Sequence, residues 1–378
     1  VQGASTADDD RFARFYWEVS DYNEFRPIAK GGSKAWVVPP ITEVLQWNDG
    51  GKILKRSSTS VRTRNEDLYL KEGLVWTYAK ETGRRFGYYP PDGLFSHTGF
   101  ILIPRNDISL WKLLAVVNSN LYHSLFLSQT IERTWESGEV GSVPWLEDLD
   151  SSEELEELAR SQYEWMLKSR LSDPVSPYYV APSIMPKSNI NGFYYSHPHT
   201  NKSEKRVNIE DKFGSQSDSI KQATRKSKMW KFRGKSQLEE HSDTIDKIIY
   251  EKAGISEKAQ EQILEEIYLR TSVEPEDREV PDPESVPEVP ENIDEQVKDL
   301  VHHFAMEAVR EESDGIIPLE GTDEQADMLD RIVEQFEDAY GEHAQDRLVE
   351  VDDILGAESA ADEAYPNLRS FIENDLFA

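Results

Sequence analysis

The sequence predicts an α+β protein with a mainly β lobe first, a helical region next and an acidic helical region last. Three observations support this order. Short apolar runs between glycine, proline and asparagine turns fill residues 11–108, as in β-rich regions. From residue 110 onward, apolar residues recur at helical spacing. The final segment, residues 271–378, holds 33 Asp and Glu against 6 Lys and Arg.

The length of 378 residues fits two or three domains, each large enough for a hydrophobic core. Apolar residues make up only 38% of the chain, but 9 Trp, 16 Tyr and 14 Phe indicate real packing. We expect four segments: a β-rich lobe (1–145), a helical support region (146–270), a Pro/Glu linker (271–292) and an acidic helical C-terminal region (293–378).

Strand and turn signals alternate in the first segment. The strand candidates are residues 17–19, 35–38 and 100–103, which are rich in β-branched, aromatic and other apolar side chains. The turn sequences are Gly31-Gly32, Asn48-Asp49-Gly50-Gly51 and Pro90-Pro91-Asp92-Gly93.

Helical patterns follow. One helix is predicted from the apolar positions Leu110, Leu113, Leu114, Val117, Leu121 and Leu125, and a loop over residues 137–145 comes next. A second helix should begin at Ser151, which forms a capping box with Glu154. Residues 172–206 contain several prolines and are expected to be irregular.

The later segments are patterned more simply. Residues 242–270 predict two helices around Gly254, the second capped by Ser256. The Pro/Glu linker should be extended and solvated. Two amphipathic helices follow it, with apolar positions from Ile293 to Phe304 and from Leu329 to Tyr340.

Several classes of function are excluded by what the sequence lacks. It contains no cysteine, so disulfides, thiolate catalysis and Cys-based zinc sites are ruled out. It contains no run of about 18 apolar residues, and we expect no contact with a membrane. The start lacks the pattern of a signal peptide, so we expect a cytoplasmic protein. The chain begins with Val1, and we interpret it as a piece of a longer polypeptide.

Motifs for catalysis are also missing. There is no phosphate-cradling GxxxxGK[ST] loop, no GxGxxG turn and no GxSxG elbow. Neither prolyl pair follows Asn or Asp, so neither forms the Asn/Asp-Pro-Pro-aromatic loop that grips a flipped adenine. His197-His199 and His302-His303 make poor zinc sites without cysteine, so we expect no bound metal.

Charge is distributed unevenly along the chain. Residues 1–130 carry 16 Lys and Arg against 14 Asp and Glu, although the whole chain has a net charge of −30. Such acidity is typical of cytoplasmic proteins from salt-accumulating halophiles; an ordinary acidic protein is the alternative. A polyanion such as DNA would be repelled unless cations are kept where it binds.

Three basic segments stand out against this background. Residues 52–64 hold five cations without an acid, residues 221–235 hold seven without an acid, and Arg84-Arg85 forms a small third patch. Cations neutralise phosphates, and Trp230 and Phe232 are suited to stacking on bases. The alternative is a set of solvated faces. The predicted DNA contacts are Lys30, Lys52, Lys55, Arg56, Arg62, Arg64, Arg84, Arg85, Lys226, Lys228, Trp230, Lys231 and Arg233.

A series of short sequence words resembles one family. The words are, in chain order, residues 15–19 (FYWEV), 30–32 (KGG), 44–51 (VLQWNDGG), 64–76 (RN…Y…GL.W), 91–99 (PDG.FS..G), 113–119 (LLAVVNS), 138–144 (GEVG.VP) and 245–263. Their order resembles the target-recognition region of large adenine-N6 DNA methyltransferases. These are the type IIG restriction-modification enzymes and the PglX methyltransferases of BREX phage-defence systems.

The resemblance implies a division of labour. This chain would supply DNA target recognition, and a catalytic domain absent from it would bind S-adenosylmethionine and methylate adenine. The chain itself would hold no cofactor and no catalytic residue. Its expected partners are double-stranded DNA, that catalytic domain and other defence-system subunits.

Two other readings remain open. The chain could be an acidic interaction scaffold of a defence complex without direct DNA contact. It could also be a separate nuclease or other hydrolase, although the metal and nucleophile motifs of such enzymes are missing.

Overall fold

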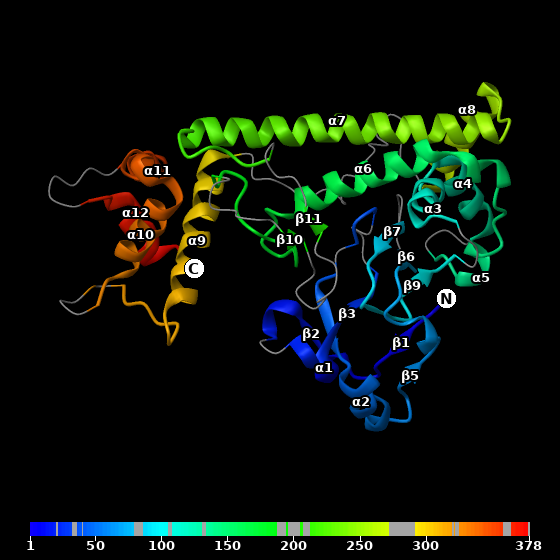
Figure 1. The fold of residues 1–378 in the computed structure, drawn as a ribbon, viewed down its shortest axis with the longest axis horizontal. Coiled ribbons are helices and arrows are strands. Elements are labelled where there is room, and N and C mark those ends of the chain that lie inside the picture. Colours follow the sequence, from blue (N-terminus) through cyan, green and yellow to red (C-terminus); the bar gives the residue numbers. More distant parts are fainter. Residues whose placement is uncertain are drawn as a thin grey trace.

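A computed structural model describes most of the chain. The described residues are 1–19, 22–31, 36–39, 41–78, 86–104, 108–130, 134–186, 194–195, 205–206, 212–271, 292–319, 321, 325–357 and 364–376. Small sheets gather at one end of the molecule, long helices run along the opposite edge, and four later helices form a unit at the side (Figure 1). This mixture of helices and separate small sheets is compatible with the predicted α+β class.

The strands of the N-terminal lobe form three small sheets. They are β1 (Ala4–Ser5), β2 (Ala13–Phe15), β3 (Phe25–Ala29), β4 (Glu43–Gln46), β5 (Arg62–Thr63), β6 (Gly73–Thr77), β7 (Phe86–Tyr89), β8 (Leu94–Phe95) and β9 (Gly99–Leu102). The first sheet has the order β2-β4-β3-β8, with β3 and β8 parallel, and the second has the antiparallel order β7-β6-β9. Strand β1 pairs with β5. Three short helices accompany them: α1 (Asp9–Phe12), α2 (Lys52–Ser57) and α5 (Ser137–Val140).

Strand β6 joins two hydrophobic cores. Successive side chains of a strand point to opposite faces of the sheet. Leu74 and Trp76 therefore enter the core shared with the helices, whereas Val75 enters the smaller core of the lobe. Every residue of β6 is buried, because both faces of its sheet are covered.

Aromatic contacts fix this sheet to the helices. Tyr88 of β7 stacks on Trp111 with 4.5 Å between ring centroids, and Tyr163 packs edge-on against both rings. Trp76 Nε1 donates a hydrogen bond of 3.0 Å to the carbonyl of Trp135. Buried aromatic rings therefore anchor the lobe to the helical region.

The helix predicted across residues 110–125 is wrong as a single element, because the structure divides it. Helix α3 (Leu110–Val117) ends at Asn118, whose side chain exchanges hydrogen bonds with the backbone of Phe86. Helix α4 (Asn120–Gln129) begins at Ser119, which accepts a hydrogen bond from Tyr122 N. Asn118 therefore pairs with a strand edge instead of continuing the helix.

Three other local predictions are wrong. Helix α6 (Glu153–Arg170) begins after Ser152, and Ser151 bonds back to the carbonyl of Asp148, so the predicted capping box is not formed. Residues 17–19 are not a strand, since Tyr16–Glu18 form a 3₁₀ turn. Val37 forms one isolated bridge to Gly87 at a φ of 59°, instead of belonging to a strand.

Helix α7 (Ile220–Lys252) is the longest helix that the structure describes. Its 33 residues span about 50 Å, and it merges the basic segment with the first of the two helices predicted over 242–270. Gly254, at a φ of 66°, then separates it from α8 (Glu257–Thr271), as predicted. Strands β10 (Tyr194–Tyr195) and β11 (Lys205–Arg206) form a short antiparallel pair. The Pro/Glu linker falls almost entirely outside the described residues.

The C-terminal unit contains two more helices than the apolar stripes predicted. Its helices are α9 (Ile293–Glu311), α10 (Met328–Tyr340), α11 (Ala344–Leu355) and α12 (Pro366–Asn374). They close around Phe304, Phe336 and Leu368, which are all buried. The Asp352 carboxylate accepts hydrogen bonds of 2.9 and 2.8 Å from the backbone N–H groups of Asn367 and Leu368, which caps α12.

This acidic unit docks on the start of α7. The Glu350 carboxylate accepts a 2.7 Å hydrogen bond from Ile220 N and pairs with Arg347, which donates to the carbonyl of Asp218. A carboxylate is favoured at a helix N-terminus by the helix dipole. Acidic residues of the C-terminal region therefore have a structural role at this end of the basic helix.

Candidate nucleic-acid interface

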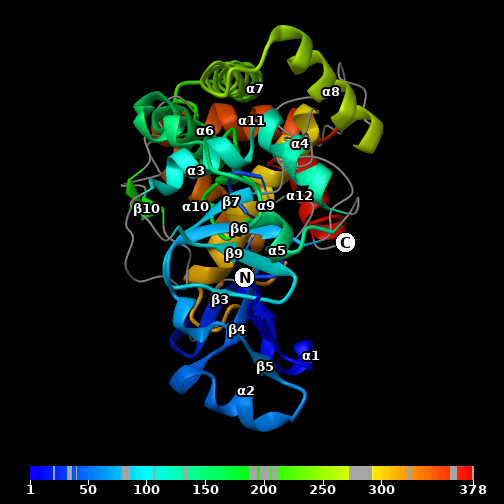
Figure 2. The ribbon, with the colours of Figure 1, turned by 90° about the vertical axis from the view of Figure 1, so that its right-hand side faces the viewer.

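Helix α7 presents the basic segment along one edge of the molecule. Both views show the helix on the outside, above α6 (Figures 1 and 2). A complete capping box at Ser219 and Gln222 starts it. The sequence can form this helix because residues 220–252 contain no proline and only one glycine.

One face of α7 carries a row of four cations, of which Lys221, Arg225 and Lys228 are exposed and Lys235 is half-buried. We call these residues the outer stripe: Lys221, Arg225, Lys228, Phe232 and Lys235. They recur every three or four residues, so they lie along one side of the helix over about 21 Å. The buried side of the helix holds residues such as Ile220, Ser227 and Leu238. Phe232, in the middle of the stripe, is 74% exposed.

The outer stripe is not neutralised within the described residues. Lys221, Arg225, Lys228 and Lys235 form no ion pair there. Lys226, by contrast, lies off the stripe and contacts Asp218 at 2.6 Å. Burial raises the pKa of Asp218, but hydrogen bonds from Lys226 and Ser215 N outweigh burial and leave that pKa below its usual value. Among the predicted contacts, Lys226 is thus paired with a carboxylate of the protein, whereas Lys228 forms no ion pair with a described residue.

Trp230 has a packing role that the sequence did not reveal. Its ring stacks on Trp165 of α6, with 5.1 Å between centroids and 15° between planes. The ammonium group of Lys212 lies 5.3 Å from the Trp230 ring centroid. Trp230 is half-buried, so Phe232 is the more exposed aromatic side chain of the segment. Lys231 is also half-buried, whereas Arg233 is exposed.

The cations of the N-terminal lobe mostly have partners in the protein. Lys30 contacts Asp9 at 2.9 Å and Glu43 at 2.5 Å. Burial lowers the pKa of Lys30, but hydrogen bonds to the two carboxylates outweigh burial and raise that pKa. The neighbouring pairs are Lys52 with Asp49 at 3.4 Å and Lys55 with Glu66 at 2.6 Å.

The arginines of this lobe are bound differently. Arg62 donates to the backbone carbonyls of Thr59 and Val61, and Arg64 donates to the side chain of Gln2. Arg56 is exposed and forms no ion pair with any described residue. Arg84 and Arg85 lie outside the described residues.

The two basic groups lie far apart. Helix α2 and strand β5, which carry residues 52–64, are at one end of the molecule, and α7 is at the other (Figures 1 and 2). The sheets lie between them in both views. Lys52 and Lys228 therefore do not belong to one continuous surface. The outer stripe combines cations that form no ion pair with a described residue and an exposed ring.

Lys221, Arg225 and Lys235 belong to the outer stripe but are not among the individually predicted contacts. The signal for them was present, because their spacing with Lys228 follows a helix. Among the described residues, no group of three or more His, Asp or Glu side chains could hold a metal ion. No helix in the described ranges has the length and apolar character needed to cross a membrane.

Comparison with known proteins gives one informative similarity. The chain is 29% identical over 170 residues to the adenine-specific methyltransferase BrxX of Escherichia coli O9:H4 (strain HS). The match covers 41% of this chain and 13% of BrxX, so it spans a small part of that protein. No protein-family model matches the chain. BrxX is an adenine-specific methyltransferase, which is the class of protein that the short sequence words also resemble.

Proposed function

We propose that this chain is the DNA target-recognition part of a site-specific adenine-N6 DNA methyltransferase in a BREX-type phage-defence system. Catalysis and S-adenosylmethionine binding belong to another part of the parent protein. The similarity to BrxX supports the methyltransferase relationship, and the sequence words support the recognition role.

The observation that carries DNA binding is the outer stripe of α7. In a chain with a net charge of −30, four cations on one helix face form no ion pair with a described residue. Counter-ion release gives such a face affinity for a phosphate backbone without base specificity. Phe232 can pack on sugars or bases beside it. The outer stripe would thus position the duplex.

Base reading is assigned to the N-terminal lobe, where the sequence resembles target-recognition regions. Arg56 is exposed and Arg62 lies on the nearby short strand β5. An arginine that bonds both acceptors of a guanine discriminates against other bases by about 1–3 kcal/mol. Because this lobe and α7 lie at opposite ends, the two groups would contact different stretches or sides of the DNA, or different conformations of the parent protein.

The test is a pair of charge reversals on the outer stripe, Arg225→Glu with Lys228→Glu. The matched control is Lys247→Glu with Lys258→Glu, which makes the same charge change at exposed sites of α7 and α8. Fluorescence anisotropy with a labelled duplex, at several salt concentrations, should show at least tenfold weaker binding for the stripe variant only. Its log–log salt slope should fall by about two.

The scaffold reading predicts a different result. If the chain contacts only proteins, both variant pairs leave duplex binding unchanged, or both weaken it equally through net charge. Either outcome would refute the role of the outer stripe. Circular dichroism confirms that each variant keeps its helices.

A further inference from the structure

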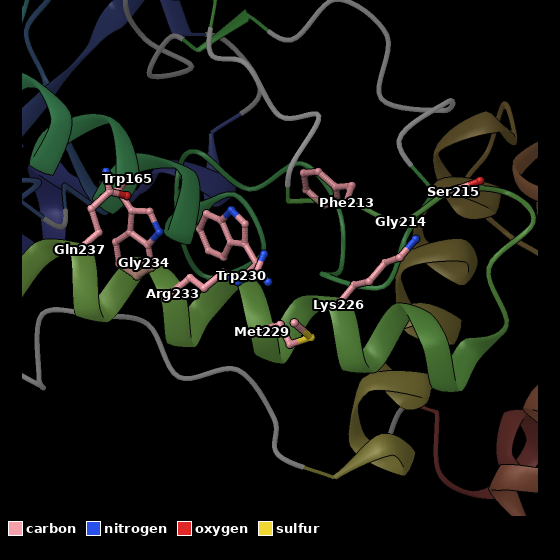
Figure 3. A pocket seen from close by; sticks show the side chains of 10 residues that line it. All are labelled: Trp165, Phe213, Gly214, Ser215, Lys226, Met229, Trp230, Arg233, Gly234 and Gln237. Carbon is pink, nitrogen blue, oxygen red and sulfur yellow. The ribbon is translucent and has the colours of Figure 1, made fainter.

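A pocket lies beside α7, on a different face from the outer stripe (Figure 3). Its volume is about 490 Å³, within the usual range for small-molecule sites. It lies between α7 and the segment that precedes this helix, next to the C-terminal half of α6. The lining residues are Trp165, Phe213, Gly214, Ser215, Lys226, Met229, Trp230, Arg233, Gly234 and Gln237.

The lining is positively charged. Lys226 and Arg233 are seven residues apart on α7, so both lie on the same side of the helix, about 10 Å apart along its axis. No Asp or Glu lines the pocket. Arg233 forms no ion pair with a described residue, and its guanidinium has the planar donor geometry that suits phosphate. The pocket therefore favours an anionic group.

Lys226 is not fully committed to its carboxylate. Asp218, its partner, also accepts a 2.7 Å hydrogen bond from Ser215 N. Asp218 would keep that bond if the Lys226 side chain, which is 56% exposed, turned toward a ligand. Asp218 accepts from Lys226 at 2.7 and 2.6 Å, and the ammonium group has three N–H donors, so a third donor is available to a phosphate.

The pocket also offers flat apolar surface. Trp230 is held in one orientation by its stack on Trp165, and Phe213 lies between Trp230 and Lys226 in the close view (Figure 3). Met229, which is 41% exposed, adds a polarisable side chain beside the rings. A planar ring can pack there without an ordering cost for Trp230. Gln237 supplies a carboxamide that can both donate and accept hydrogen bonds.

We propose that this pocket binds a nucleotide, with the phosphate at Lys226 and Arg233 and the base against Trp230 and Met229. The same chemistry is offered by a free mononucleotide and by an unpaired nucleotide of a single strand. A base inside a duplex does not offer it, because its faces are covered by stacking. This site is separate from the proposed duplex contact, since no residue of the outer stripe lines it.

The test is calorimetric titration of the whole chain with three probes: AMP, a single-stranded oligodeoxyadenylate and inorganic phosphate. We expect AMP or the oligonucleotide to bind with a Kd below about 1 mM, and inorganic phosphate to bind at least tenfold more weakly. Binding by AMP identifies a free nucleotide as ligand. Binding by the oligonucleotide alone identifies a single strand.

Variants connect the signal to the pocket. Arg233→Gln should weaken binding of the successful probe about tenfold, because a charge-assisted hydrogen bond to phosphate is lost. Lys247→Gln, at an exposed site of the same helix outside both the outer stripe and the pocket, is the matched control and should leave nucleotide binding unchanged. Arg233 is exposed, so its replacement should not impair folding, which circular dichroism checks.

Three results would overturn the proposal. They are no binding by any probe, equal binding of phosphate and the nucleotide probes, and equal weakening by Arg233→Gln and Lys247→Gln. Duplex affinity is measured on Arg233→Gln and on Lys228→Gln of the outer stripe. If Lys228→Gln weakens duplex binding while no nucleotide probe binds, the pocket proposal fails and the duplex proposal stands. If Arg233→Gln weakens nucleotide binding while Lys228→Gln leaves duplex affinity unchanged, the duplex proposal fails and the pocket proposal stands.

Discussion

The indole nitrogen of Trp165 occupies the place beside α7 where a side chain at Gly234 would begin. A β-carbon at residue 234 would overlap Nε1 of that ring. This close approach lets Trp165 stack on Trp230, one turn earlier on α7. A single glycine in the long helix therefore sets how closely α6 and α7 pack and holds the aromatic wall of the pocket.

Gly234→Ala should destabilise the protein. Alanine is favoured over glycine in a helix interior by about 1 kcal/mol, but overpacking against Trp165 costs about 1–3 kcal/mol, and the neighbouring stack must shift. Thermal unfolding followed by circular dichroism should show a lower Tm. Gly138→Ala is the control, because nothing lies within 4 Å of a β-carbon there, and its Tm should be unchanged or higher.

Asp246→Ala should loosen helix α4. The Asp246 carboxylate, on α7, accepts hydrogen bonds of 2.6 and 2.7 Å from the backbone and side-chain nitrogens of Asn120, the first residue of α4. Removing it leaves these donors without that partner, at a cost of about 1–3 kcal/mol. Urea unfolding measures the loss. Asp243→Ala removes an exposed carboxylate of the same helix and should change stability little.

His303 should make the docking of the C-terminal unit sensitive to pH. It shares a 3.1 Å hydrogen bond with Tyr179, and its pKa is lowered chiefly by burial, although Glu307 acts in the opposite direction. Below about pH 6.5 the unfolded imidazole binds a proton that the folded one does not. The contribution of His303 to the free energy of unfolding is therefore fully present above about pH 6.5, and it is lost as the pH falls through the folded pKa.

Thermal unfolding at a series of pH values from about 5 to about 8 tests this pH dependence. His303→Gln should be less stable than the parent at pH 8 but should lose less stability on acidification. His343, which is on the same unit and 35% exposed at its side chain, provides the control variant His343→Gln. Identical pH profiles for the parent and His303→Gln would contradict the prediction.

Lys30 and Lys228 should separate structural from DNA-binding cations. Lys30→Gln removes the shared partner of Asp9 and Glu43 and should lower the Tm of the protein. Its effect on duplex affinity should be smaller than that of Lys228→Gln, which should leave Tm unchanged. Anisotropy and thermal unfolding on the same preparations make the comparison. A larger loss of DNA binding for Lys30→Gln would reassign the main contact to the N-terminal lobe.

Helical periodicity gave correct positions for most later helices. The apolar spacing from Ile293 and Leu329 predicts α9 and α10, and Gly254 and Ser256 mark the boundary between α7 and α8. These signals are local, because a helix satisfies its hydrogen bonds within itself. The strand candidates were less successful, since strands need partners that are distant in sequence.

The sequence by itself determined the α+β class, the acidic C-terminal helices and the concentration of cations in residues 221–235. Only the tertiary structure decided which charges stay unpaired. Lys30, Lys55 and Lys226 meet carboxylates from other segments or turns, whereas the outer stripe does not. Tertiary packing also turned Trp230 onto Trp165 and placed the two basic groups at opposite ends. The physical reason is that composition fixes the charges available, but their partners depend on which segments the buried core brings together.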